Sequence, residues 1–225
     1  MDRYPYIVIE GLDGTGKTTL RRGLFRLFQG LYQVTPLAIL TTNFTAPSTA
    51  EDLVDGKYRP TPANRDRYLA ALAADKHATA TRLILPSLPQ RPVIADRWLL
   101  SEIAFFSVKH DQDPKITHDR LSAESALVPD LTLVLTLDEE AAMERAQARA
   151  GDATRPDWDV LEIQRRVRET YQHVSATTDA FPGLGPVAVL DAGEERAHVL
   201  LTAWNALLDR GLLPEPPYAQ QEMTT

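Results

Sequence analysis

The stretch that most constrains the fold of this chain runs from Gly11 to Thr18 and reads Gly-Leu-Asp-Gly-Thr-Gly-Lys-Thr. It fits the pattern G-x-x-x-x-G-K-[ST] without a mismatch. A β-branched run at 6–10 precedes it, and apolar residues at helical spacing follow it as far as position 28. The motif therefore lies between a predicted strand and a predicted helix, the context of a P-loop. In such a loop, backbone N–H groups and a helix N-terminus face phosphate oxygens.

The residue types of this loop indicate that it binds ATP with Mg²⁺. Lys17 would add a charge near the β- and γ-phosphates, and the Thr18 hydroxyl can hold the metal. Glycines permit the tight turn. We expect the nucleotide-binding residues of the loop to be Gly11, Asp13, Gly14, Thr15, Gly16, Lys17, Thr18 and Thr19.

The remainder of the chain alternates apolar runs with helical patterns. The predicted strands are 6–10, 34–40, 93–96, 131–137 and 187–191, and the predicted helices are 18–28, 64–85, 98–108, 117–127, 139–149, 160–180 and 197–208. Strands separated by helices imply a five-stranded parallel sheet with helices on both faces, an α/β fold of the P-loop NTPase type. We expect one domain over 1–212, with a small Arg-containing lid at about 149–158 and a loose Pro-rich tail at 213–225.

Polar residues end three of the predicted strands: Glu10, Asp96 and Asp191. Ligands of such sheets lie at the carboxyl ends of the strands. Asp96 could order Mg²⁺, and the following Arg97 could span two phosphates. A salt bridge at a strand end is the structural alternative for this pair.

Arginines gather in and before the predicted lid. Arg149 and Arg155 are close enough to the loop to neutralise charge on a transferring phosphoryl group. A solvated helix face is the alternative for both, and it is the expected role of Arg145. We expect Arg165, Arg166 and Arg168 on the next helix to be mostly solvated as well.

Composition excludes several classes of protein. The formal net charge of −7 disfavours a nucleic-acid polymer or an anionic membrane as the main partner. The chain has no cysteine, so disulfides and zinc-thiolate sites are excluded, and its histidines lie at no metal-ligand spacing. The first residues lack the apolar run of a signal peptide, and no apolar stretch would span a bilayer. We expect a cytoplasmic protein.

The chain lacks the N-K-x-D and D-x-x-G signatures of a GTPase. A kinase is therefore a better interpretation than a nucleotide-dependent switch.

Taken together, these segments resemble the thymidylate kinase family from Ile7 to about Ala203. The segments that carry the resemblance are 9–19, Leu72-Ala-Ala-Asp-Lys-His77, Asp96-Arg-Trp-Leu-Leu-Ser101 with Ala104-Phe105, 129–135, 166–171 and 189–192. The resemblance implies that Lys17 and Thr18 hold ATP and Mg²⁺, and that Arg97 bridges the donor and acceptor phosphates. It also implies a homodimer, and it places Asp191 before a loop that skirts adenine.

On the acceptor side the resemblance implies contacts from Asp13, Phe44, Leu72, Lys76, Arg97, Ser101, Phe105 and Phe106. Here the chain departs from the family pattern. The segment 43–49 has no arginine for the acceptor phosphate, and Leu72, Lys76 and Phe106 stand where the family has an aromatic, an Arg and a Gln. Gly14 stands where some members carry a catalytic Arg, which implies a charge-neutralising role for Arg149 or Arg155.

Three functions follow in order. The first is transfer of the ATP γ-phosphoryl group to a nucleoside monophosphate, dTMP or a similar compound. The second is a kinase of the same fold that acts on a nucleoside or another small molecule. The third is a nucleotide-binding protein without turnover. The presence of Lys17, Asp96 and Arg97 together speaks against the third.

Overall fold

The computed structural model describes residues 3–41, 45–46, 62–125, 127–150 and 158–214. The sites predicted at Phe44 and Arg155, and nearly all of the predicted lid, lie outside these residues.

A parallel five-stranded sheet with the order β2-β3-β1-β4-β5 forms the centre of the molecule. The strands are β1 (Tyr6–Gly11), β2 (Leu37–Leu40), β3 (Val93–Asp96), β4 (Leu131–Thr136) and β5 (Val187–Asp191). Every residue of β1 is buried, as expected for a central strand covered on both faces. The predicted α/β fold is therefore confirmed.

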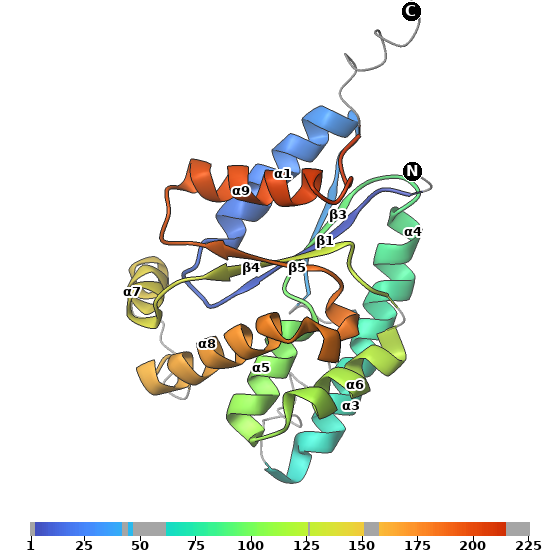
Figure 1. Cartoon of the computed structure of the whole chain (residues 1–225). Coiled ribbons are helices and arrows are strands. Elements are labelled where there is room, and N and C mark those ends of the chain that lie inside the picture. Colours follow the sequence, from blue (N-terminus) through green and yellow to red (C-terminus); the bar gives the residue numbers. More distant parts are fainter. Residues whose placement is uncertain (1–2, 42–44, 47–61, 126, 151–157, 215–225) are drawn as a thin grey trace, which may run out of the picture.

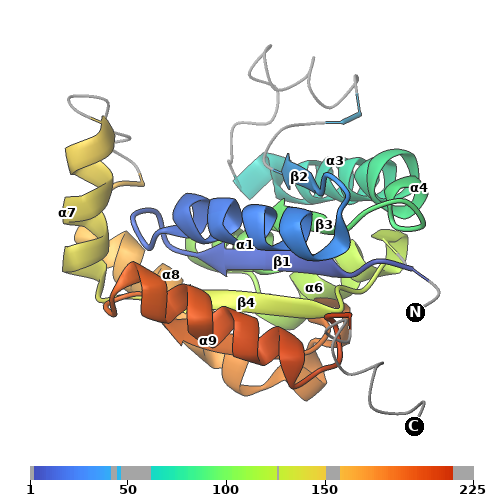
Figure 2. The ribbon, with the colours of Figure 1, turned by 90° about the horizontal axis from the view of Figure 1, so that it is seen from above.

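Helices cover both faces of the sheet. They are α1 (Lys17–Tyr32), α3 (Arg65–Thr79), α4 (Leu85–Ser87), α5 (Leu99–His110), α6 (Pro114–Ser125), α7 (Glu139–Ala150), α8 (Leu161–Ala176) and α9 (Arg196–Leu208). Figures 1 and 2 show α1 and α9 side by side on one face, with α3, α5, α6 and α8 on the other. Helix α7 stands apart at the end of the sheet toward which β4 and β5 point (Figure 1).

Two hydrophobic clusters fill the spaces above and below the sheet, because successive side chains of a strand point to opposite faces. In β1, Tyr6 and Val8 belong to the cluster under α3, α5, α6 and α8. Ile7 and Ile9 belong to the cluster under α1 and α9. The sheet is thus held from both sides, and its carboxyl-end edge supports the loops that follow β1, β3 and β4.

The boundaries differ from the predicted ones mainly at one long helix. The pattern predicted over 64–85 comprises α3, a π-helical turn η2 (Ala80–Ile84) and α4. Pro86 was expected to stop the helix, but it lies in the first turn of α4, where a proline is tolerated.

Smaller differences occur elsewhere along the chain. Short 3-10 turns occupy η1 (Pro62–Asn64), η3 (Thr178–Ala180) and η4 (Pro182–Leu184), so the helix predicted over 160–180 ends early. Strand β2 begins at Leu37 rather than at 34. Leu213, placed in the tail by the sequence, packs in the cluster under α1 and α9. Within the described ranges, no helix combines the length and the apolar character needed to cross a membrane.

Candidate active site

The loop between β1 and α1 adopts a tight turn that depends on its glycines. Gly14 has φ +90°, and a Cβ atom there would lie 1.9 Å from the carbonyl oxygen of Ala142 in α7. Helix α7 therefore packs directly on the loop, and the absence of a side chain at position 14 is what allows this approach. Thr15 closes the turn from within, since its hydroxyl donates to the Leu12 carbonyl at 2.8 Å.

Lys17 is folded inward against the same loop. Its Nζ donates to the carbonyl oxygens of Gly11 at 2.9 Å and of Leu12 at 2.6 Å, and it lies 3.7 Å from an Asp13 oxygen. The side chain is only 7% exposed. Burial, and then the charge of Arg97, lowers the pKa of Lys17 to about 7, although the nearby carboxylates act in the opposite direction. The amine can therefore change charge near neutral pH.

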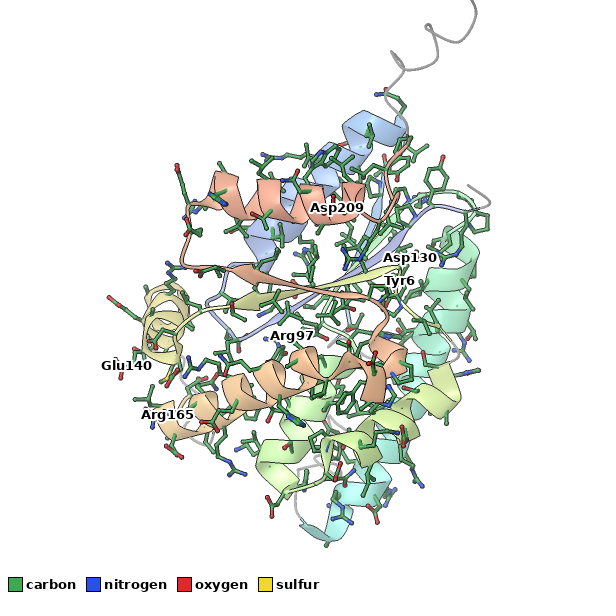
Figure 3. All side chains as sticks on the ribbon, viewed as in Figure 1. Tyr6, Arg97, Asp130, Glu140, Arg165 and Asp209 are labelled. Carbon is green, nitrogen blue, oxygen red and sulfur yellow. The ribbon has the colours of Figure 1, made fainter. Side chains whose placement is uncertain are left out.

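Arg97 follows β3 and lies beside Asp13. Its guanidinium forms an ion pair with the same Asp13 oxygen that Lys17 approaches, and it donates to the Ser101 hydroxyl at 3.0 Å. Arg97 has φ +72°, in the left-handed region that is unfavourable for a residue with a side chain. The Thr41 hydroxyl, which donates to the Arg97 carbonyl, and the backbone bond from Arg97 N to Ile9 O at 2.9 Å hold this conformation. Figure 3 shows Arg97 near the middle of the molecule.

Glu10 holds the segment around Arg97 in place. Its fully buried carboxylate accepts hydrogen bonds from the Trp98 N–H at 2.7 Å, from the Ser101 N–H at 3.3 Å and from the Ser101 hydroxyl. The Tyr171 hydroxyl in α8 donates to the same carboxylate at 3.2 Å. Glu10 thus joins β1, the N-terminus of α5, and α8.

The Asp96 carboxylate is buried at the end of β3 and pairs with Arg21 of α1 at 3.3 Å. The Thr18 side chain, also predicted to contact Mg²⁺, is half-buried in the first turn of α1. No cluster of three or more metal-ligating side chains occurs within the described residues. One hydroxyl and one carboxylate nevertheless suit Mg²⁺, which takes few protein oxygens when substrate phosphates supply others.

The predicted acceptor side is divided between site and core. Lys76 is 1% exposed, forms an ion pair with Glu102 at 3.0 Å and donates to the Thr41 carbonyl at 3.2 Å. Its charge is therefore already balanced by a carboxylate. Leu72 and Phe106 lie in the hydrophobic core, and Phe106 is completely buried. Neither presents a side chain to solvent.

Phe105 is half-buried at the border of that core. Its ring centroid lies 5.6 Å from that of Trp158 and 5.9 Å from that of Tyr68. This aromatic group connects α5 with α3 and with the residue just before α8.

The remaining predicted residues lie around the edge of the site. Thr19 is exposed on α1, and Asp191 is exposed at the end of β5, where it accepts a bond from the Gly193 N–H at 2.7 Å. The backbone of Arg149 belongs to the last turn of α7. Arg165 and Arg168, expected to be mostly solvated, both form ion pairs with Glu139 at the start of α7, at 3.0 and 2.8 Å.

Sequence reasoning missed four residues around the site. Glu10 was recognised only as the end of a strand, and Arg21 and Glu102 were not singled out. Asp75 was quoted only within a motif, yet its buried carboxylate accepts hydrogen bonds from the backbone N–H groups of Thr45 at 2.6 Å and Ala46 at 2.7 Å. Glu10 and Asp75 had a visible signal, since each is a carboxylate inside an apolar segment.

Comparison with known proteins agrees with this geometry. Residues 9–181 match the family model described as thymidylate kinase. A "Probable thymidylate kinase" of Methanocorpusculum labreanum is 32% identical over 170 residues, which cover 72% of this chain and 81% of that protein. A "Probable thymidylate kinase" of Thermococcus kodakarensis is 29% identical over 215 residues, or 90% and 98%.

A bacterial relative extends over a similar length. The "Thymidylate kinase" of Bradyrhizobium diazoefficiens is 28% identical over 221 residues, covering 94% of this chain and 91% of its own. The chain therefore belongs to the thymidylate kinase family of ATP-dependent nucleoside monophosphate kinases.

Proposed function

We propose that this chain transfers the γ-phosphoryl group of ATP to dTMP or a closely related nucleoside monophosphate. The observation that carries the proposal is the meeting of Lys17 and Arg97 on one oxygen of Asp13. It brings the cation of the phosphate-binding loop next to the arginine that follows β3. A phosphoryl group passing between two substrates needs positive charge on both sides of its path.

In the proposed reaction the acceptor oxygen attacks the γ-phosphorus in line with the leaving ADP oxygen, without a covalent enzyme intermediate. Lys17 would bind the β- and γ-phosphates, and Arg97 would bridge the donor and acceptor phosphates. Asp13 would orient both cations and lie beside the acceptor's sugar. The residues act by positioning and by charge neutralisation. Mg²⁺, held by Thr18 and Asp96, would further neutralise the phosphate oxygens.

Several finer assignments belong to the same proposal. Arg149 and Arg155 would contact the transferring group from a lid at about 149–158, and Asp191 would lie near the adenine. Ser101 and Phe105 would border the acceptor, whereas the buried Leu72 and Phe106 would shape it only through the core. We further propose a homodimer that acts on nucleotides in the cytoplasm.

One observation favours a second acceptor class. The charge of Lys76 is balanced by Glu102 at 3.0 Å, and the segment 43–49 contains no arginine. An acceptor without a phosphate, such as a nucleoside, would not require either cation. A kinase acting on a nucleoside is therefore the alternative to a monophosphate kinase.

The test is Mg-ATP-dependent ADP release with dTMP, dUMP, other monophosphates and the free nucleosides. We expect turnover with dTMP in the wild type and its loss in Lys17→Ala and Arg97→Ala, with Arg82→Ala as a control on an exposed arginine of η2. Circular dichroism should show that each variant is folded. Turnover only with nucleosides would favour the alternative. ATP-dependent transfer that survives Lys17→Ala would refute the role of the loop.

A further inference from the structure

A surface cavity of about 510 Å³ lies between α1 and the edge strand β2, on the side of the sheet that carries α1. Its lining residues are Arg21, Arg22, Phe25, Arg26, Ala38 and Leu40. Small-molecule sites typically have volumes of roughly 300–1,000 Å³. The cavity is therefore large enough for a small organic ligand, and no part of the proposed reaction uses it.

Its position follows from the burial pattern of β2. Leu37 and Ile39 pack against the core under α3 and α5, whereas Ala38 and Leu40 point to the other face and are exposed. Leu40 is 41% exposed, unusual for a large apolar side chain in a strand. Together with the half-buried Phe25 it gives the cavity an apolar side.

The opposite side of the cavity is strongly basic. Arg22 and Arg26 are four residues apart and share one face of α1, with Arg21 on the neighbouring ridge. Helix α1 contains no acidic residue, β2 has no charged one, and the lining contains no carboxylate. Within the described ranges, neither Arg22 nor Arg26 forms an ion pair or a side-chain hydrogen bond. In a chain with a formal net charge of −7, such a concentration of unpaired guanidinium groups is a local exception.

Guanidinium groups bind phosphate oxygens with paired N–H donors, and several of them suit a ligand with more than one phosphate. An aromatic and an apolar side chain beside them suit the organic part of the same molecule. We propose that this cavity is a second ligand site, separate from the P-loop, that binds a nucleoside polyphosphate.

Arg21 connects this site with the catalytic region. Its guanidinium lines the cavity and also pairs with Asp96 at 3.3 Å. A phosphate in the cavity competes with the Asp96 carboxylate for that guanidinium. Occupancy of the second site therefore alters the electrostatic environment of Asp96, the proposed Mg²⁺-binding residue.

The experiment is a titration of the isotope-labelled chain with ATP, free of Mg²⁺, followed by NMR of the backbone amides. We expect two sets of signals with different midpoints, one from the P-loop around Gly14 and one from Ala38 and Leu40. In Arg22→Ala/Arg26→Ala the second set should titrate about tenfold more weakly, because two charge-assisted contacts are lost, and the first set should not change.

A matched control is Arg82→Ala/Arg120→Ala, which removes the same charge from two exposed arginines on η2 and α6. This control should leave both midpoints unchanged. The cavity variant should also keep the wild-type ADP release measured without added effector. Signals of Ala38 and Leu40 that follow the P-loop midpoint in every variant would overturn the proposal. So would an equal loss of affinity in the control, which would indicate nonspecific attraction.

Discussion

Substitution of Glu10 tests whether one buried carboxylate holds the active-site segments together. Glu10→Ala removes the acceptor of the Trp98 N–H, of the Ser101 N–H and hydroxyl, and of the Tyr171 hydroxyl. Trp98 is the N-cap residue of α5, and its own side chain makes no capping bond. Glu10 therefore supplies the acceptor that the first turn of this helix lacks.

The magnitude follows from the number of donors and from their freedom to turn. Hydrogen bonds to a charged group contribute about 1.5–3 kcal/mol each. The hydroxyls of Ser101 and Tyr171 lie 2.8 Å apart and can bond each other, so the backbone N–H groups bear most of the loss. We expect Glu10→Ala to lower the free energy of unfolding by about 4 kcal/mol, a large part of the roughly 5–15 kcal/mol of a typical domain.

Glu10→Gln should cost much less, about 1–2 kcal/mol. Its amide oxygen can still accept from the Trp98 N–H, and both hydroxyls can rotate to accept from its NH₂ group. The difference between the two variants thus isolates the missing acceptor from the missing charge.

The assay is urea unfolding followed by circular dichroism, with the slope m compared among variants so that a midpoint shift reports stability. Glu194→Ala, at an exposed position, is the control and should change stability by less than about 0.5 kcal/mol. A loss of under about 1 kcal/mol in Glu10→Ala would refute the reasoning. Equal losses in Glu10→Ala and Glu10→Gln would refute it as well.

Three further predictions concern the same region. Lys17 has a pKa of about 7, so its amine loses charge above that pH and ATP affinity should fall by up to about tenfold per pH unit; calorimetry showing a flat profile from about pH 6 to 9 would contradict this. Gly14→Ala sets its Cβ against the α7 backbone and should cost about 2–3 kcal/mol in urea unfolding, whereas Gly30→Ala, in open space within α1, should stabilise by up to about 1 kcal/mol. Glu102→Gln leaves the buried Lys76 without its carboxylate and should cost about 3–5 kcal/mol, and a stability equal to that of the wild type would show that the pair is unimportant.

The sequence by itself determined the P-loop and the succession of strands and helices. Both are encoded by short-range features: a glycine spacing that permits one turn, and apolar periods that differ between strands and helices. The strands at 93–96 and 187–191 were predicted with the residues that the structure has. Right-handed crossovers then left a parallel sheet as the architecture, and its carboxyl edge as the place for Lys17 and Arg97.

The tertiary structure alone decided which side chains meet at that edge. Glu10 caps a helix 88 residues away, Arg21 pairs with Asp96, and Lys76 is neutralised by Glu102. It also decided that Phe106 belongs to the core. The physical reason is that a partner distant in the chain is selected by strand register and by the rotation of each helix about its axis. Packing of the whole core sets both quantities, and no local spacing in the sequence specifies them.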